Sequence, residues 1–163
     1  MRRPDRPPGP PPLLVQMQLS GVAEPIVLSF DREAEPDVVG RISELVDAGA
    51  YLGARLKSAS YWLALELAAA PAPRRVEPRR VRHSKFDAGS VGWSWEKTPG
   101  DGRGEFFVTR DRQDGLDSSY QMIGHVAGGL AALLAIAPEP TRFIKGQRRT
   151  EPMLVEAFGR APS

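Results

Sequence analysis

Two pairs of β-favouring runs, each interrupted by a short polar turn, restrict most strongly what this chain can fold into. The first pair reads LLVQMQL at 13–19 and PIVLSF at 25–30. The second pair reads VGWSWEK at 91–97 and GEFFVTR at 104–110, around the turn TPGDGR. Aliphatic and aromatic runs bounded by turn residues are typical of hairpins. Both pairs therefore predict antiparallel strands.

Aromatic residues are concentrated in the second predicted hairpin. Val91, Trp93 and Trp95 alternate along one run and should share one face. Phe106 and Phe107 lie on the other run. Aromatic side chains beside arginines can stack on the bases of single-stranded nucleic acid, but tryptophans at alternating strand positions more often belong to a core. We expect the core placement.

A helical stripe follows Pro36, a residue that suits the first turn of a helix. Its spacing of three and four residues predicts a helix from 37 to about 57. The run YWLALEL at 61–67 alternates instead, so we expect a strand there, although 58–70 can also be read as helix. The stripe consists of Val38, Ile42, Leu45, Gly49, Leu52, Leu56, Ala59 and Leu63.

Two further helices are expected in the C-terminal half. Ser118 and Gln121 match a capping box, which predicts a helix over 119–136. Its apolar run at 122–137 has 16 residues, fewer than the roughly 20 that span a bilayer, so we expect a buried helix and no membrane contact. A short terminal helix is predicted for MLVEAF at 153–158, with Gly159 as its C-cap.

The predicted fold class is α+β, with an antiparallel sheet of two or more hairpins packed against two principal helices. The 163 residues, 41% hydrophobic, suit one domain over 13–160. Residues 1–12, MRRPDRPPGPPP, predict a disordered Pro/Arg-rich arm. A basic connector at 71–85 would join the two halves of the domain.

Small residues recur every four positions in both long predicted helices. They would allow close helix packing within the domain or at a dimer seam, which offsets the cost of about 1 kcal/mol for glycine in a helix. The residues are Gly49 and Gly53 in the first helix and Gly124, Gly128 and Ala132 in the second.

Positive charge is concentrated in two segments. Residues 71–85 carry six cationic side chains against one glutamate, and 141–150 carry four more. Guanidinium groups bind phosphate bidentately, so such rows are candidate sites for an anionic partner; the alternative is a solvated surface loop. The candidate anion-binding residues are Arg74, Arg75, Arg79, Arg80, Arg82, Lys85, Arg142, Lys145, Arg148 and Arg149.

No established catalytic or cofactor motif is present, and we predict neither a cofactor nor a metal site. The chain has no cysteine, which excludes disulfides, thiolate ligands and a cysteine nucleophile and is consistent with the cytoplasm. Asp111, Asp114 and Asp117 lack the spacing of an EF-hand calcium loop, so turn formation explains them better. Of the two histidines, His83 lies among arginines and His125 in the second predicted helix.

These observations favour a non-catalytic binding or accessory module whose arginine clusters engage a nucleic acid or an acidic protein. One alternative is a structural or assembly subunit that forms homo-oligomers. A second is an enzyme of unknown class that uses Asp111, Asp114, Asp117 or His125 in a cleft. Between a catalytic and a non-catalytic function, the sequence favours the non-catalytic one.

Overall fold

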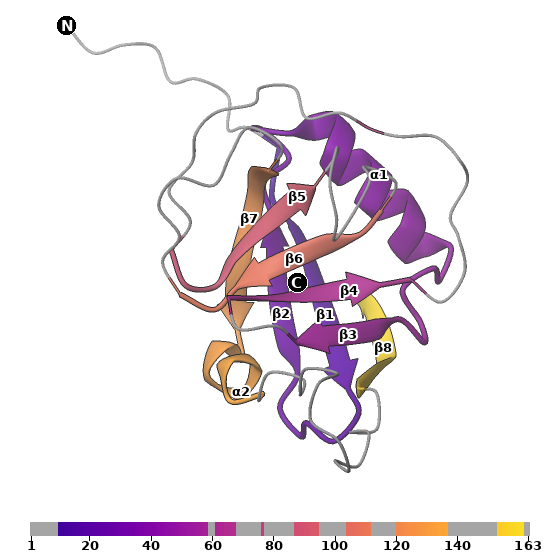
Figure 1. The fold of residues 1–163 in the computed structure, drawn as a ribbon. Coiled ribbons are helices and arrows are strands. Elements are labelled where there is room, and N and C mark those ends of the chain that lie inside the picture. Colours follow the sequence, from indigo (N-terminus) through magenta and orange to yellow (C-terminus); the bar gives the residue numbers. More distant parts are fainter. Residues whose placement is uncertain are drawn as a thin grey trace, which may run out of the picture.

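In the computed structural model, the described residues are 10–58, 61–67, 76, 87–94, 104–111, 120–136 and 153–161, and their strands close into an antiparallel barrel (Figure 1). The strand order is β1-β2-β7-β5-β6-β4-β3-β8. The strands are β1 (Leu13–Leu19), β2 (Ile26–Phe30), β3 (Arg55–Ser58), β4 (Trp62–Glu66), β5 (Ser90–Ser94), β6 (Phe106–Thr109), β7 (Tyr120–Gly128) and β8 (Met153–Arg160).

The predicted α+β class, with an antiparallel sheet of hairpins packed against two principal helices, is wrong, because the sheet closes into a barrel. Both predicted hairpins are confirmed, since β1 pairs with β2 and β5 pairs with β6. However, two segments expected to be helices are strands. β7 bridges the hairpins by pairing with β2 and β5, and β8 closes the barrel between β1 and β3.

The barrel interior is filled by side chains from alternate positions of each strand. On β1, for example, Leu13, Val15, Met17 and Leu19 are buried, while the residues between them face outward. This period of two places one side of every strand in a continuous hydrophobic core. The core includes a tryptophan, because Trp93 on β5 is fully buried, which confirms its core placement.

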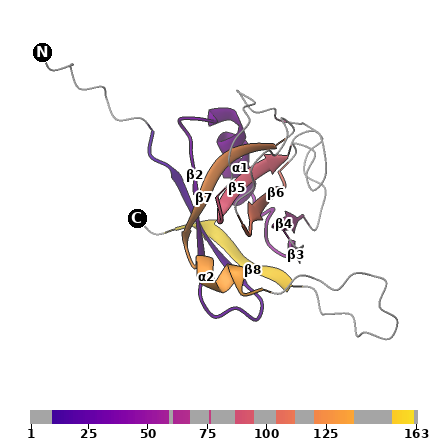
Figure 2. The same ribbon diagram turned by 60° about the vertical axis from the view of Figure 1, so that its left-hand side comes forward.

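Two helices lie at opposite ends of the barrel, as the two views in Figures 1 and 2 show. Helix α1 (Pro36–Asp47) begins with its proline as expected and turns five apolar side chains into the core. Helix α2 (Leu130–Leu134) is a short segment that contributes Leu133 to the core. The buried side chains of α1 are Val38, Val39, Ile42, Leu45 and Val46.

The predicted extension of the first helix to residue 57 is wrong. Gly49 and Gly53 have φ angles of 72° and 76°, so both occupy turns after α1 instead of a helix interior. Leu56 then lies on β3 and pairs with Leu65 on β4. The strand expected within 61–67 is confirmed as β4, and residues 58 and 62–66 of the ambiguous segment are extended.

The helix predicted over 119–136 is wrong for 120–128, which form β7 with alternating burial, and only 130–134 are helical, as α2. Gln121 and Ile123 are buried, whereas Met122 and His125 are exposed, as on a barrel strand. The predicted C-terminal helix is wrong for a tertiary reason. Residues 153–160 gain hydrogen-bonding partners on both sides as β8, and this pairing overrides a weak helical pattern.

Gly124 of β7 pairs with Phe30 of β2, and the two backbones lie close together there. A Cβ built on Gly124 would lie 2.1 Å from the backbone oxygen of Ser29, closer than any packed carbon. The β5–β7 register shifts here, because Val91 pairs with Gly124 and Gly92 with Met122, which leaves Ile123 as an extra residue on β7. Bulges of this kind bend barrel strands. Gly124 and Gly128 therefore serve strand pairing and not the predicted helix packing.

An aromatic cluster joins the end of α1 to the barrel wall. The Tyr51 ring stacks on Phe158 at a centroid distance of 4.5 Å and lies 5.5 Å from Phe106. Its hydroxyl donates a 2.7 Å hydrogen bond to the Gly104 carbonyl oxygen. Tyr51 is fully buried, and this burial raises the pKa of its hydroxyl far above the ordinary value.

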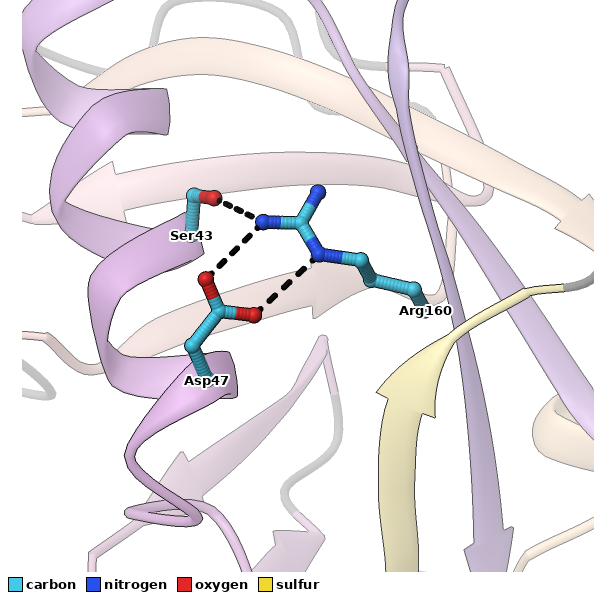
Figure 3. A network of polar contacts seen from close by, with 3 residues as sticks. All are labelled: Ser43, Asp47 and Arg160. Carbon is cyan, nitrogen blue, oxygen red and sulfur yellow. Dashed lines mark hydrogen bonds and ion pairs between the residues drawn. The ribbon is translucent and has the colours of Figure 1, made fainter.

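A polar network on the surface ties α1 to β8 (Figure 3). The Arg160 guanidinium donates to both carboxylate oxygens of Asp47, at 3.1 and 3.0 Å, and to the Ser43 hydroxyl at 2.7 Å. The hydrogen bond from Arg160 lowers the pKa of Asp47. Because the groups are exposed, we regard the network as a positioning contact more than as a source of stability.

Some expectations concern residues that the structure does not describe. They include nearly all of the predicted N-terminal arm at 1–12 and, apart from Val76, the connector at 71–85. The arm and the domain limits stay predictions. Among the described residues, no helix is long and apolar enough to cross a membrane.

Gly124→Ala should destabilise the barrel by about 1–3 kcal/mol or more, because its methyl group would collide with backbone that cannot move aside. Gly40→Ala is the matched control. Gly40 lies in α1 with open space around its Cβ position, so this change should stabilise the protein by about 0.5–1 kcal/mol. Urea denaturation of both variants measures the two shifts, and equal effects would contradict the close approach.

Tyr51→Phe should reduce stability at neutral pH by about 0.5–1.5 kcal/mol, since it removes the hydrogen bond to Gly104. Above about pH 10, where a tyrosine in the unfolded chain ionises, wild type should lose stability faster than the variant. The reason is that the raised pKa keeps Tyr51 protonated only in the folded state. Denaturation curves from pH 7 to 11 test this, and a constant difference between the proteins would refute it.

Candidate active site

A small apolar cluster lies on the outside of the barrel wall, separate from the main core. It consists of Trp62 and Ala64 on β4 and Phe107 on β6, and we call it the outer patch. Ala64 pairs directly with Phe107, and their neighbours along each strand point into the barrel. The strands that carry the patch lie at the front in Figure 1.

The far end of the Phe107 ring lies against the backbone of β5. Phe107 pairs with Gly92, and a Cβ built on Gly92 would lie 2.2 Å from the Cζ atom of the ring. Glycine at this position is therefore required by the ring above it and not by a turn. The absence of a side chain fixes the ring against the barrel wall.

The patch is well packed but has an exposed member. Ala64 is 2% and Phe107 3% exposed, whereas Trp62 packs against them and is partly exposed. The barrel interior is already filled by other side chains, so the patch provides a second apolar surface that barrel closure does not need. Of its three residues, Trp62 is the one that solvent reaches.

The outer patch is the middle of a row of residues that crosses five strands. Strand pairing places Lys57 of β3 beside Ala64, then Phe107, then Gly92, then Met122 of β7. Lys57 and Met122, at the two ends, are exposed. The row therefore has a cationic end, an aromatic centre and an apolar end.

Arg110 braces the barrel end next to the patch. It follows β6 directly, and its guanidinium donates to the Ser58 hydroxyl at the end of β3 and to the Ile136 carbonyl after α2. A further hydrogen bond of 3.4 Å reaches the Leu134 carbonyl. Desolvation lowers the pKa of Arg110, against an opposing effect of the Asp111 carboxylate. The charge also suits the C-terminal end of a helix.

The predicted anion-binding residues cannot be compared with this geometry, because all ten lie outside the described residues. Within the connector only Val76 is described, and its carbonyl oxygen accepts a 3.0 Å hydrogen bond from the Trp93 indole. Whether the ten cations bind an anionic partner, and whether the chain forms homo-oligomers, stay predictions.

The structure places two of the four residues weighed for catalysis. Asp111 is exposed just after β6, and His125 is exposed on β7, between Ser90 of β5 and Ser29 of β2. Asp114 and Asp117 lie outside the described residues. Within the described ranges, no three His, Cys, Asp or Glu side chains come close enough to hold a metal ion.

The sequence model of the family described as cyclophilin type peptidyl-prolyl cis-trans isomerase/CLD matches residues 14–158. This chain belongs to that family. No curated protein matches its sequence significantly. Among solved structures it resembles a cyclophilin type peptidyl-prolyl cis-trans isomerase of Cryptosporidium parvum, crystallised with and without the dipeptide Ala-Pro. The identity is 14% in both cases, and the TM-scores are 0.65 and 0.64. The comparisons cover 92% and 93% of this chain and 99% of the other.

Membership of the cyclophilin family corrects the functional prediction. The family is one of isomerases, so the prediction of a non-catalytic nucleic-acid-binding or assembly module is wrong. The preference for a non-catalytic function over an enzymatic one is wrong for the same reason. The second alternative, an enzyme, was right in kind, although the family match does not single out its aspartates or histidine. The resemblance to the solved cyclophilins establishes the fold alone, because the sequence identity is only 14%.

Sequence reasoning did not single out the outer patch. Its signal was present in YWLALEL, where Trp62 and Ala64 alternate with leucines, because both faces of that strand are apolar. A strand with two apolar faces must meet something on each side, and only one side can be the barrel interior. Phe106 and Phe107 carry the same signal on β6.

Gly92→Ala should displace the Phe107 ring and reduce stability by about 1–3 kcal/mol. Phe107→Leu in the same chain should recover part of that loss, because the smaller side chain leaves room for the new methyl group. A double-mutant cycle by urea denaturation measures the coupling between the two positions. Additive effects of the two changes would show that the ring does not rest on Gly92.

Proposed function

We propose that this chain catalyses cis-trans isomerisation of peptide bonds that precede proline, and that the outer patch binds the proline ring. Family membership supports the reaction, and the aromatic cluster outside the core supports the location. The single observation that carries the location is Phe107, whose ring end lies over Gly92 and which clusters with Ala64 and Trp62.

The reaction requires rotation about a bond with partial double-bond character. Its barrier is about 18–20 kcal/mol, and for bonds before proline the uncatalysed exchange takes tens to hundreds of seconds. The planar amide is stabilised by charge separation between oxygen and nitrogen, which water favours. An apolar surface against the proline ring removes water from one side of this amide and so favours the twisted state.

Aromatic surfaces are well suited to proline. The pyrrolidine ring is compact and apolar and loses little conformational entropy on binding, so proline-rich segments commonly dock on aromatic side chains. Trp62, the partly exposed member of the patch, would make the first contact, and Phe107 would form the floor. Both side chains project from strands, which hold them more rigidly than loops would.

We also propose that the protein acts in the cytoplasm. The absence of cysteine from all 163 residues supports a reducing compartment. Cell fractionation with an antibody against the protein tests this location, and recovery in a secreted fraction would contradict it.

Wild-type protein should accelerate isomerisation of a short peptide with one Xaa-Pro bond, measured by NMR exchange spectroscopy. Phe107→Ala should lower kcat/KM at least about tenfold, a loss near 1.4 kcal/mol of transition-state stabilisation. Leu154→Ala is the control, because Leu154 is an exposed apolar residue on β8, away from the patch strands. Circular dichroism should show both variants folded.

A folded Phe107→Ala variant with full activity would place the reaction elsewhere on the molecule. Absence of acceleration by the wild-type protein would contradict the proposed activity itself.

A further inference from the structure

The two ends of the row through the outer patch differ in chemistry. Lys57 on β3 is exposed, and its side chain lies on the same face as its partner Ala64. Met122 on β7 is 39% exposed and pairs with Gly92 on the same outer face. Any segment that lies across the patch along this row meets a cation at one end and a thioether at the other.

The ammonium group of Lys57 is available to a ligand. Among the described residues it makes no hydrogen bond or ion pair. Two acids lie on the neighbouring strands. The Glu105 carboxylate accepts a 3.0 Å hydrogen bond from the Leu67 backbone. Glu66 lies two positions along β4 from Ala64, as the backbone pairing partner of Arg55, and no ion pair is seen between Glu66 and Lys57.

The opposite end of the row is apolar and has no side chain to interrupt it. Gly92, between Phe107 and Met122, contributes only backbone. An exposed methionine is adaptable and accepts varied apolar groups. No charged residue of the row lies between Phe107 and this end, so the row is electrostatically asymmetric.

The spacing of the strands sets the length of a matching ligand. Lys57 and Met122 each lie two strands from Phe107, about 10 Å at the usual separation between strands. An extended peptide advances about 3.3 Å per residue, so each end lies about three residues from the one on Phe107. Because the lysine side chain is long, its ammonium group can reach a ligand residue that lies two or three positions from the one on Phe107.

We propose that the preferred substrates are extended proline-containing segments with an acidic residue two or three positions from the proline on one side and an apolar residue on the other. This inference rests on the proposed function. Lys57 is the specificity-determining residue, because it lies next to the patch and has no partner of its own within the described part of the chain.

Four matched peptides test the proposal by NMR exchange spectroscopy. The first peptide carries Asp three residues before the proline and Leu three residues after it, and the second carries these two residues in the reverse order. The third and fourth peptides are the same two with Lys in place of Asp. For one of the two orders, wild type should favour the Asp peptide by about two- to fivefold in kcat/KM, as expected for an exposed ion pair. The preference should shrink as salt is added.

Lys57→Glu should invert the preference in favour of the Lys peptide. Arg32→Glu is the matched control, because it changes the net charge equally from the turn after β2 and should leave the preference intact. Equal kcat/KM for Asp and Lys peptides in both orders, or an unchanged preference in Lys57→Glu, would overturn the inference. Either result leaves the proposed function standing, whereas no acceleration of any peptide would remove the proposed function itself.

Discussion

Closure of the barrel by hydrogen bonds is the constraint on which the rest of the structure depends. β8 pairs with β1 on one side and β3 on the other, so the described strands leave no open edge. Closure divides every strand into an inner and an outer face. The inner face fills with aliphatic and aromatic side chains, and α1 and α2 lie over the two ends. Because the inner face is filled, a binding site on these strands has to lie on the outer face.

The outer patch uses this division. The adjacent phenylalanines on β6 lie on opposite faces of the strand, because Phe106 enters the core and Phe107 faces outward against Gly92. A binding surface on the wall of a filled barrel inherits the rigidity of that wall. Arg110 adds to it by linking the ends of β3 and β6 to the segment after α2. The positions of the side chains in the outer patch are thus set by the same contacts that hold the barrel together.

Local signals allowed individual elements of the fold to be predicted but not the barrel, and nonlocal pairing explains most of what was missed. Both hairpins and the start of α1 depend on neighbours in sequence, and all were predicted. β7 and β8 depend on partners far along the chain, and their apolar runs also suit helices. Gly124, read as a helix-packing residue, makes sense only once Ser29 lies beside it.

The site was missed for a related reason. A concentration of arginines is conspicuous in a sequence, whereas a single phenylalanine on the outer face of a strand is not. Assigning Phe107 to the patch requires knowing which face of β6 is the interior, and this is set by Trp93 and Val108, which point inward. The sequence could indicate two apolar faces on β4, but not which of them meets a ligand.

The pairing of β8 with β1 also bears on how the chain folds during synthesis. The bond between the Leu154 amide and the Ser20 hydroxyl spans 134 residues, and β1 gains its second partner only when β8 is present. On the ribosome, β1 and β3 therefore keep unpaired edges until the last strand emerges, and such edges invite pairing with other chains. A fold rich in distant contacts also forms slowly. We therefore expect the nascent chain to pass through its most aggregation-prone state just before β8 leaves the exit tunnel.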